Sequence, residues 1–402
     1  MPLFPFESSA RRLLRHLRLP AAARAEHRTD RRTLPPDDPG AESAVRACID
    51  WLCEAQDRST SSDGGVARHY SLLTGWSASY PETTGYIIPT LLTAGDRYGD
   101  TGLIERGRRM LDWLVSIQFP DGGFQGGTIG QEPVVPVTFN TGQILLGLAA
   151  GTRLLGDEYR VPMRSAADWL TRTQDPDGCW RSHPTPFAKP GEKAYETHVA
   201  WGLMEAVRAE ENDEWKAAAL RNVDWALGLQ SENGWFGSCC LTDPDNPLTH
   251  TLGYVLRGIV EAWRLSGDTR YLEAAVRTAD GLLTAQRANG SLPGRLARDW
   301  SGQVPWSCLT GNVQIAACWL LLHDEVGDRG YAGAAARANS FVRRTIRFDG
   351  PASTRGGVKG SFPVWGNYGQ YQYLNWAPKF AIDAFLLEID ARGSAGPDRV
   401  DC

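Results

Sequence analysis

The chain has 402 residues, of which 42% are hydrophobic and 22% charged, and its formal net charge at pH 7 is −5. These proportions are those of an ordinary globular protein, and the acidic balance argues against nucleic acid as the main partner. No apolar run reaches the roughly 18 residues that a membrane-spanning helix needs, and the N-terminus lacks the apolar core and cleavage site of a signal peptide. We therefore expect a cytoplasmic protein.

Residues 1–40 differ in composition from the rest of the chain. Arginines outnumber acidic residues there, and the leucines among them allow a short amphipathic helix that contacts anionic lipid weakly. The alternative is a solvated, disordered tail. We predict such a tail for residues 1–40 and a second for residues 393–402, so that the folded unit spans residues 41–392. The arginines are Arg11, Arg12, Arg15, Arg18, Arg24, Arg28, Arg31 and Arg32.

The eight cysteines show no metal-ligand spacing, and two of them, Cys239 and Cys240, are adjacent. We interpret them as free thiols in a reducing compartment. Neither a metal nor a cofactor is expected.

A short pattern recurs along the chain: a helical run ends in Trp-Leu, a Gln follows, and an Asp-Gly or Asn-Gly turn then presents an aromatic residue. The copy Trp113-Leu114, Gln118, Asp121-Gly122 and Phe124 is the most complete. Self-similarity at a period of roughly 50 to 60 residues predicts a repeat architecture. Further copies stand at Trp51-Leu52, Gln56 and Asp63-Gly64; Trp169-Leu170, Gln174, Asp177-Gly178 and Trp180; Trp225, Gln230, Asn233-Gly234 and Trp235; and Leu282-Leu283, Gln286 and Asn289-Gly290.

Two sets of helices alternate from about residue 42. One set carries charges on one face, as surface helices do; it is predicted at roughly 42–55, 101–117, 161–173, 214–229, 270–285 and 330–347. The other set is more apolar; it is predicted at roughly 83–94, 139–151, 197–209, 249–264, 309–323 and 375–389. No stretch shows the sustained period-two alternation of a sheet. Together these sets predict an all-α fold, an (α/α)6 toroid with six outer and six inner helices.

The Gln…Asp-Gly-Trp/Phe turns resemble the repeat of the α/α-toroid superfamily, over about residues 42–390. Its members include squalene–hopene cyclases, protein prenyltransferases, glycosidases, polysaccharide lyases, sugar epimerases and the C-terminal domain of glucuronyl C5-epimerases. The resemblance implies the toroid fold. It says little about the reaction, because the superfamily hosts unrelated chemistries.

The loops that lead into the inner helices of such a toroid converge on one mouth, so the starts of these helices are where we look for chemistry. Glu82 and Glu196 are the leading carboxylates, since two carboxyl groups facing one cavity can act as acid and base on a glycosidic bond. Each has an alternative part as a charge at a helix N-terminus. His198 and His250 are further acid–base candidates; with Glu196 they would also supply three metal ligands, but no local spacing supports a metal.

Polar and aromatic residues deeper in the inner helices are candidate substrate-binding groups, because polar groups on buried helices need partners. They are Tyr86, Asn140, Gln143, Trp201, Tyr254, Asn312, Asn375 and Lys379. Asn375, like the threonines at the other helix starts, has capping as an alternative, and Asp383 is an expected partner of Lys379. Two long loops add aromatic and cationic residues that suit pyranose rings carrying carboxylates: Arg295, Trp306, Arg355, Lys359, Trp365 and Tyr371.

Three function classes follow. A polar mouth rimmed by Trp and Tyr favours a carbohydrate-active enzyme that cleaves or modifies an oligo- or polysaccharide, with uronate-containing chains as one option. Hydrolysis is the plainest reaction, while elimination and epimerisation stay open. A terpenoid cyclase of the squalene–hopene type is the alternative, although the Asp-x-Asp-Asp run of that family is missing. The third class is a non-catalytic component of polysaccharide assembly.

Overall fold

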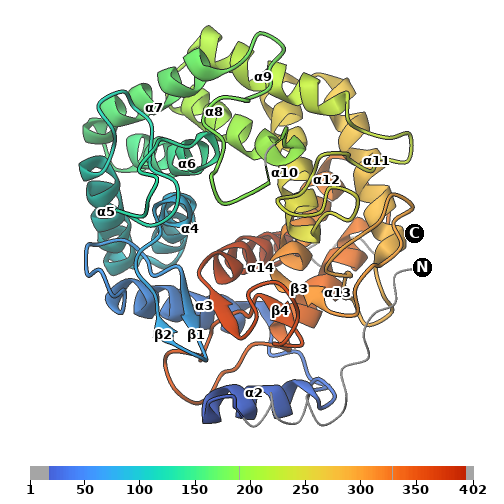
Figure 1. Ribbon diagram of the computed structural model, residues 1–402. Coiled ribbons are helices and arrows are strands. Elements are labelled where there is room, and N and C mark those ends of the chain that lie inside the picture. The colour runs from blue at the N-terminus through green and yellow to red at the C-terminus, as the bar shows by residue number, and fades with distance from the viewer. Residues whose placement is uncertain (1–17, 190, 328, 395–402) are drawn as a thin grey trace.

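The structure, a computed structural model, describes residues 18–189, 191–327 and 329–394 (Figure 1). Two rings of helices surround a common centre. The outer ring consists of α3 (Ala41–Asp57), α5 (Thr101–Ser116), α7 (Arg160–Thr173), α9 (Asp213–Leu227), α11 (Thr269–Ala285) and α13 (Tyr331–Arg343). The inner ring consists of α4 (Pro81–Tyr98), α6 (Thr138–Leu154), α8 (Thr197–Ala209), α10 (Thr249–Ser266), α12 (Leu309–Val326) and α14 (Trp376–Ser394). The predicted (α/α)6 toroid is confirmed.

Each inner helix packs against the next one along the chain, and α14 packs back on α4, which closes the ring. Glycines on the facing sides allow this close approach. A Cβ on Gly85 of α4 would come within 2.5 Å of the Ile144 Cα of α6, and one on Gly202 of α8 would come within 2.3 Å of the Gly142 carbonyl oxygen. The glycines of the inner helices thus serve the closure of the ring.

The repeated turn is a clamp between consecutive outer helices. In one copy, the Gln174 side-chain amide donates to the carbonyl oxygens of Gly178 in the turn (3.1 Å) and of Ala218 in α9 (2.8 Å). Gly178 has a positive φ of 95°, and a Cβ there would meet the Arg221 carbonyl oxygen at 2.3 Å. The motif therefore requires glycine at this point, both for the backbone angle and for the contact.

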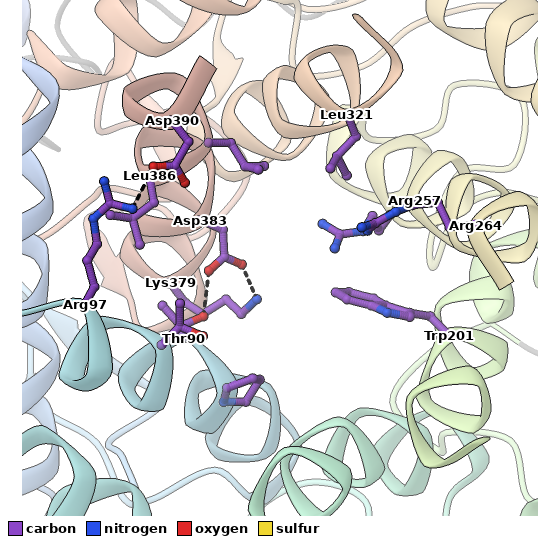
Figure 2. A pocket seen from close by; sticks show the side chains of 13 residues that line it. Thr90, Arg97, Trp201, Arg257, Arg264, Leu321, Lys379, Asp383, Leu386 and Asp390 are labelled. Carbon is purple, nitrogen blue, oxygen red and sulfur yellow. Dashed lines mark hydrogen bonds and ion pairs between the residues drawn. The ribbon is translucent and has the colours of Figure 1, made fainter. Parts of the chain in front are cut away.

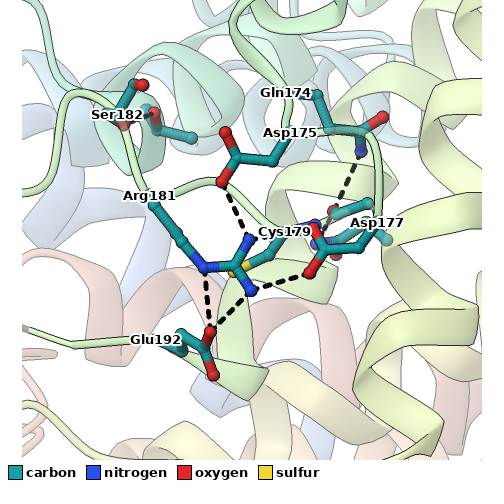
Figure 3. Close-up of polar contacts among 10 residues, drawn as sticks. Gln174, Asp175, Asp177, Cys179, Arg181, Ser182 and Glu192 are labelled. Atoms are coloured by element: carbon teal, nitrogen blue, oxygen red, sulfur yellow. Dashed lines mark hydrogen bonds and ion pairs between the residues drawn. The ribbon is translucent and has the colours of Figure 1, made fainter.

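The same clamp recurs around the ring. The repeat glutamines of the other copies also donate to the backbone of the next outer helix: Gln56 to Arg106, Gln118 to Pro162, Gln230 to Ala274 and Gln286 to Ala334. In the Asp177 copy, Arg181 additionally binds Asp175, Asp177 and Glu192 (Figure 3). The repeat is thus a structural device.

Short strands close the ring at the inner-helix N-termini. β1 (His69–Ser71) pairs antiparallel with β2 (Gly75–Trp76) and with β5 (Gln372–Leu374), so the loop before the first inner helix is joined to the loop before the last. A second pair joins β3 (Ser307–Cys308) to β4 (Ser361–Phe362). These strands are two or three residues long, too short for alternation to reveal them. Two single-turn 3-10 helices are η1 (Asp157–Tyr159) and η2 (Ala194–Glu196).

Helix α2 (Ala21–Asp30) lies within the segment for which the composition predicts disorder. Its acidic residues Glu26 and Asp30 are buried and accept hydrogen bonds from Lys359 at 2.7 and 2.6 Å. The prediction of a disordered tail is therefore wrong for residues 18–40, because Lys359, more than 300 positions away, pairs with both buried carboxylates and holds the helix on the barrel. Residues 1–17 and 395–402 lie outside the described part of the chain, as does most of the leucine- and arginine-rich stretch. Among the described helices, none combines the length and apolar character needed to span a membrane.

Candidate active site at the mouth of the barrel

Glu82 is the second residue of α4 and lies half-buried at the mouth that the inner-helix N-termini form. Burial raises the pKa of its carboxyl group to about 7, while the positive charge of Arg68 and a hydrogen bond with Tyr80 oppose the rise. A carboxyl group with this pKa exists in both protonation states near neutral pH. It can therefore donate or accept a proton there.

Aromatic residues from several elements surround Glu82. Its charge raises the pKa of the phenols of Tyr80, Tyr195 and Tyr254, after the larger effect of burial. The ring of Phe139 lies between two of them, 5.3 Å from Tyr195 and 5.5 Å from Tyr254, centroid to centroid. The mouth thus combines one accessible carboxyl group with several ring faces and edges.

Arg68 supplies a cation to the same place. Its guanidinium carbon lies 5.3 Å from the ring centroid of Tyr80 and 5.4 Å from that of Trp376, and the side chain is half-buried. Arg68 was not predicted, because one arginine in a long loop carries no signal in the sequence. Its position follows from the strand pairing, which also lets Asn375 N–H donate to the Arg68 carbonyl oxygen at 3.1 Å.

Glu196 lies at the end of η2, where α8 begins, and is 6% exposed. Burial raises the pKa of its carboxyl group to about 8, and only the charge of Lys193 lowers it. Among the described residues, its Oε2 has no hydrogen-bond partner. Glu82 is not among the causes of this shift, so the two carboxyl groups titrate as separate groups and not as a close pair. Glu196 is predominantly protonated at pH 7.

The two histidines belong to a buried layer across the barrel. His198 Nδ1 lies 2.6 Å from Gln143 Oε1, and His250 Nδ1 lies 2.7 Å from Gln314 Oε1. Because an amide oxygen only accepts, each Nδ1 carries a proton and each Nε2 is left as an acceptor. Burial lowers the pKa of His250 to about 4 and that of His198 well below its usual value, so both imidazoles are neutral at pH 7.

Aromatic rings complete this layer. Tyr254 lies 4.2 Å from His198 and 4.4 Å from His250, centroid to centroid, and Phe380 lies 5.4 Å from Tyr86. These rings come from four inner helices and meet at the centre. Glu82 lies on one side of the layer, towards the N-terminus of α4.

A cavity of about 300 Å³ lies on the other side of the layer (Figure 2). Trp201 and Lys379, both expected to bind substrate, line it together with residues from the C-terminal half of α4. The expected pair of Lys379 and Asp383 is confirmed as an ion pair. Trp201 and Lys379 are therefore separated from Glu82 by the layer, although their sequence positions placed them in one pocket.

Three candidates in the last long loop contact helix α2 instead of the mouth. Lys359 is 2% exposed and pairs with two α2 carboxylates. Trp365 stacks on His27 with ring centroids 4.1 Å apart, and the Tyr371 hydroxyl lies 2.9 Å from His27 Nδ1. The prediction that these residues bind substrate is corrected, because the chain itself occupies them.

Asn312 and Trp306 have structural roles. Asn312 accepts from Leu292 N–H at 2.8 Å and donates to the Cys308 carbonyl oxygen at 2.7 Å, so its amide ties the repeat turn to α12. Trp306 packs on Gly294, where a Cβ would meet the indole at 2.1 Å. The prediction that Asn312 and Trp306 bind substrate is therefore corrected: both make packing contacts within the protein.

The two loop arginines are also directed elsewhere. Arg295 donates to the Asn246 carbonyl oxygen (2.7 Å) and the Thr242 hydroxyl (3.0 Å), and so holds the neighbouring loop. Arg355 is exposed, and the next residue, Gly356, rests on the Ala47 carbonyl of the outer helix α3. Arg355 therefore lies over the outer ring.

A buried asparagine near a helix start keeps unpaired amide atoms within the described part of the chain. Both side-chain atoms of Asn375 have no hydrogen-bond partner there, whereas a hydrogen bond from Asn140 to the Tyr80 phenol opposes the rise of the Tyr80 pKa. Capping therefore does not account for Asn375. Buried amides of this kind need a water or a ligand. In the described ranges, no group of three or more His, Cys, Asp or Glu residues is arranged to hold a metal ion.

No protein-family model matches the chain. The squalene–hopene cyclase of Bradyrhizobium diazoefficiens is 24% identical over 274 residues, covering 48% of this chain and 41% of the cyclase. Among solved structures, an unsaturated glucuronyl hydrolase specific for heparin has a TM-score of 0.71 at 16% identity, covering 89% of this chain and 99% of its own.

Two further structures are sugar epimerases or isomerases. The cellobiose 2-epimerase of Bacillus thermoamylovorans has a TM-score of 0.66 at 11% identity and covers 87% of this chain and 97% of its own. A D-mannose isomerase has a TM-score of 0.69 at 12% identity and covers 89% and 100%. At these identities the likeness establishes the α/α-toroid fold.

Proposed function

We propose that the protein is a carbohydrate-active enzyme that cleaves or modifies an oligo- or polysaccharide at the mouth of the barrel. The observation that carries this proposal is Glu82: a half-buried carboxyl group with a pKa of about 7 among tyrosine rings. Glycosidic bonds need a proton donor that is still protonated near neutral pH. The hydrolase and epimerase structures that share the fold support the same substrate class.

Glu82 transfers the proton in this proposal. In its protonated form it donates to the leaving oxygen of a glycosidic bond, and in its ionised form it activates water or removes a proton from the sugar. Tyr80 and Arg68 stabilise the ionised form. Glu196 keeps its proton at neutral pH and serves as a hydrogen-bond donor at the same mouth. The neutral histidines hold the layer beneath.

A uronate-containing chain is the preferred substrate. Arg68 is a cation at the mouth that lies over two aromatic rings, and an arginine binds a carboxylate through two parallel hydrogen bonds. The flanking rings of Phe139 and Tyr195 offer apolar faces to a pyranose. The unpaired amide of Asn375 can bind hydroxyl groups.

A terpenoid cyclase is less well supported. Its substrate must fold inside a large apolar cavity, whereas the centre of this barrel holds hydrogen-bonded pairs of histidine and glutamine between touching rings. The likeness to the cyclase covers less than half of either chain.

The seven described cysteines are free, which supports our placement of the protein in a reducing cytoplasm.

The substitution Glu82→Gln tests the proposal. We expect turnover of a reducing-end-labelled uronate oligosaccharide to fall by about 100-fold or more, the usual contribution of a general acid or base, with a melting temperature no lower than that of the unaltered protein. Glu105→Gln on the exposed face of outer helix α5 is the matched control. Turnover that survives Glu82→Gln would remove Glu82 from the reaction. Saturable binding without turnover by the unaltered protein would instead indicate the non-catalytic class.

A further inference from the structure

The cavity below the aromatic layer is not part of the proposed catalytic mouth. It is lined by residues of α4 (from its C-terminal half), α8, α10, α12 and α14. One turn of α4 separates Glu82 from the layer residue Tyr86, and another separates Tyr86 from the cavity residue Thr90. A small molecule can therefore occupy the cavity independently of the mouth.

Arg257 dominates one wall of the cavity. Its guanidinium carbon lies 4.1 Å from the ring centroid of Trp201, and its Nε donates to Glu261 at 2.9 Å. Among the described residues, this guanidinium donates a hydrogen bond from Nε and none from its two terminal amino groups. These two groups can therefore donate to another acceptor. Figure 2 shows Arg257 and Trp201 projecting together into the cavity.

Lys379 faces Arg257 from the opposite wall. Its ammonium group pairs with Asp383, whose other oxygen accepts from the Thr90 hydroxyl at 2.7 Å. One carboxylate satisfies only part of the three-donor capacity of an ammonium group. The two cations are close enough that the charge of Arg257 lowers the pKa of Lys379, although burial is the larger cause. Both walls thus present donors to the same space.

The local charge balance is positive. Buried Glu261 is the shared carboxylate of three arginines, Arg208, Arg257 and Arg264, and Arg208 has a second partner in Glu205. Cations near helix C-termini are ordinarily favoured by the helix dipole, which accounts for Arg264 in the last turn of α10. It does not account for Arg257, which lies in the middle of that helix.

Four apolar side chains also line the cavity: Pro89, Leu321, Leu386 and Leu387. The remaining lining is polar and consists of Thr93, the ion pair of Arg97 with Asp390, and the exposed Arg264. A hydrophilic ligand would leave the four apolar side chains poorly matched. The lining suits a molecule that has a charged head and an apolar body.

We propose that this cavity binds a small amphiphilic anion, with its carboxylate or phosphate head between Arg257 and Lys379 and its apolar body against the leucines. A planar oxyanion accepts parallel hydrogen bonds from a guanidinium, and the flanking indole holds the guanidinium in place. The proposal does not depend on the activity at the mouth.

Four probes of equal chain length separate head from body. Hexanoate and hexyl phosphate carry the two possible heads, hexanol lacks the charge, and hexylammonium reverses it. We expect calorimetric titration to detect saturable binding of one or both anions at one site per chain, with hexanol and hexylammonium at least about tenfold weaker. The stronger anion identifies the head. Equal binding of hexanol and the anions would overturn the proposal.

Two substitutions test whether the ligand binds in the cavity. Leu321→Trp fills it without altering a charge, and Arg257→Gln removes the head group's donor while Arg208 and Arg264 still neutralise Glu261. Each should weaken anion binding by about tenfold or more. Glu82→Gln, at the other end of the barrel, should leave it unchanged. Anion binding that persists in Leu321→Trp would show that the ligand lies elsewhere, and this outcome remains informative even if Arg257→Gln does not fold.

Discussion

The outer wall of the barrel and its lumen use polar residues in opposite ways. In the wall, Gln174 uses its amide fully: Nε2 donates to the turn and to the next helix, and Oε1 accepts from Arg221 at 2.9 Å. In the lumen, Gln143 keeps an unpaired Nε2 and Glu196 an unpaired Oε2 within the described residues. Repetition therefore supports the fold. Within the described residues the wall also leaves a few atoms unpaired, Asn222 Oδ1 and Trp235 Nε1 among them, so it is the ionisable Glu196 that distinguishes the lumen.

The strongest test of this comparison concerns Glu196 in the lumen. Its folded pKa of about 8 exceeds the ordinary 4.5. The folded state therefore has its full stability below pH 4.5 and loses part of it as the pH rises from 4.5 to 8. At about 1.36 kcal/mol per unit, the loss is on the order of 5 kcal/mol. Glu196→Gln should abolish it. Unfolding by urea at pH 4 and pH 9 measures the difference, with the exposed Glu105→Gln as control. An identical pH dependence in the variant and the unaltered protein would show that Glu196 is solvated.

In the wall, Gly178→Ala should cost about 3 kcal/mol of unfolding free energy, because the new Cβ combines a strained backbone angle with a clash against the Arg221 carbonyl. Gly99→Ala is the matched control: Gly99 also has a positive φ, of 63°, but a Cβ added there would meet nothing within 4 Å. It should cost about 1 kcal/mol. Equal losses in the two variants would show that the contact between turn and helix contributes nothing.

A smaller effect is expected from the wall glutamine itself. Gln174→Ala removes three hydrogen bonds, one within the turn and two that join the turn to helix α9, so we expect a loss of about 2 kcal/mol. Gln370→Ala removes one hydrogen bond, to the Trp365 carbonyl oxygen, from an exposed side chain and should stay within about 0.5 kcal/mol. Thermal unfolding compares both. A loss for Gln370→Ala as large as that for Gln174→Ala would contradict the clamp.

The sequence predicts the helices well because two local signals agree: helical periodicity, and a turn motif that marks each helix end. It predicts the contacts of loops poorly. Lys359 and Trp365 have the composition of a sugar site, yet the same cationic and aromatic groups hold helix α2, whose acidic residues lie more than 300 positions away. Such pairings carry no local signal.

The lumen shows the same limit. Glu82 and Trp201 both follow from the pattern of polar residues on inner helices, but the pattern does not tell on which side of the central layer a residue lies. Arg257 and Arg68 were missed for related reasons: one is a single arginine in a long helix, and the other is positioned by strands too short to recognise.

The pH dependence of kcat/KM on a uronate oligosaccharide tests the central claim most directly, because it reports the pKa of the free enzyme's essential acid. In the unaltered protein, the activity should change with an inflection near pH 7, set by Glu82. Tyr80→Phe removes the hydrogen bond that favours the ionised carboxylate, so its inflection should move to higher pH. An inflection near pH 7 that does not move in Tyr80→Phe would contradict the assignment of the proton transfer to Glu82.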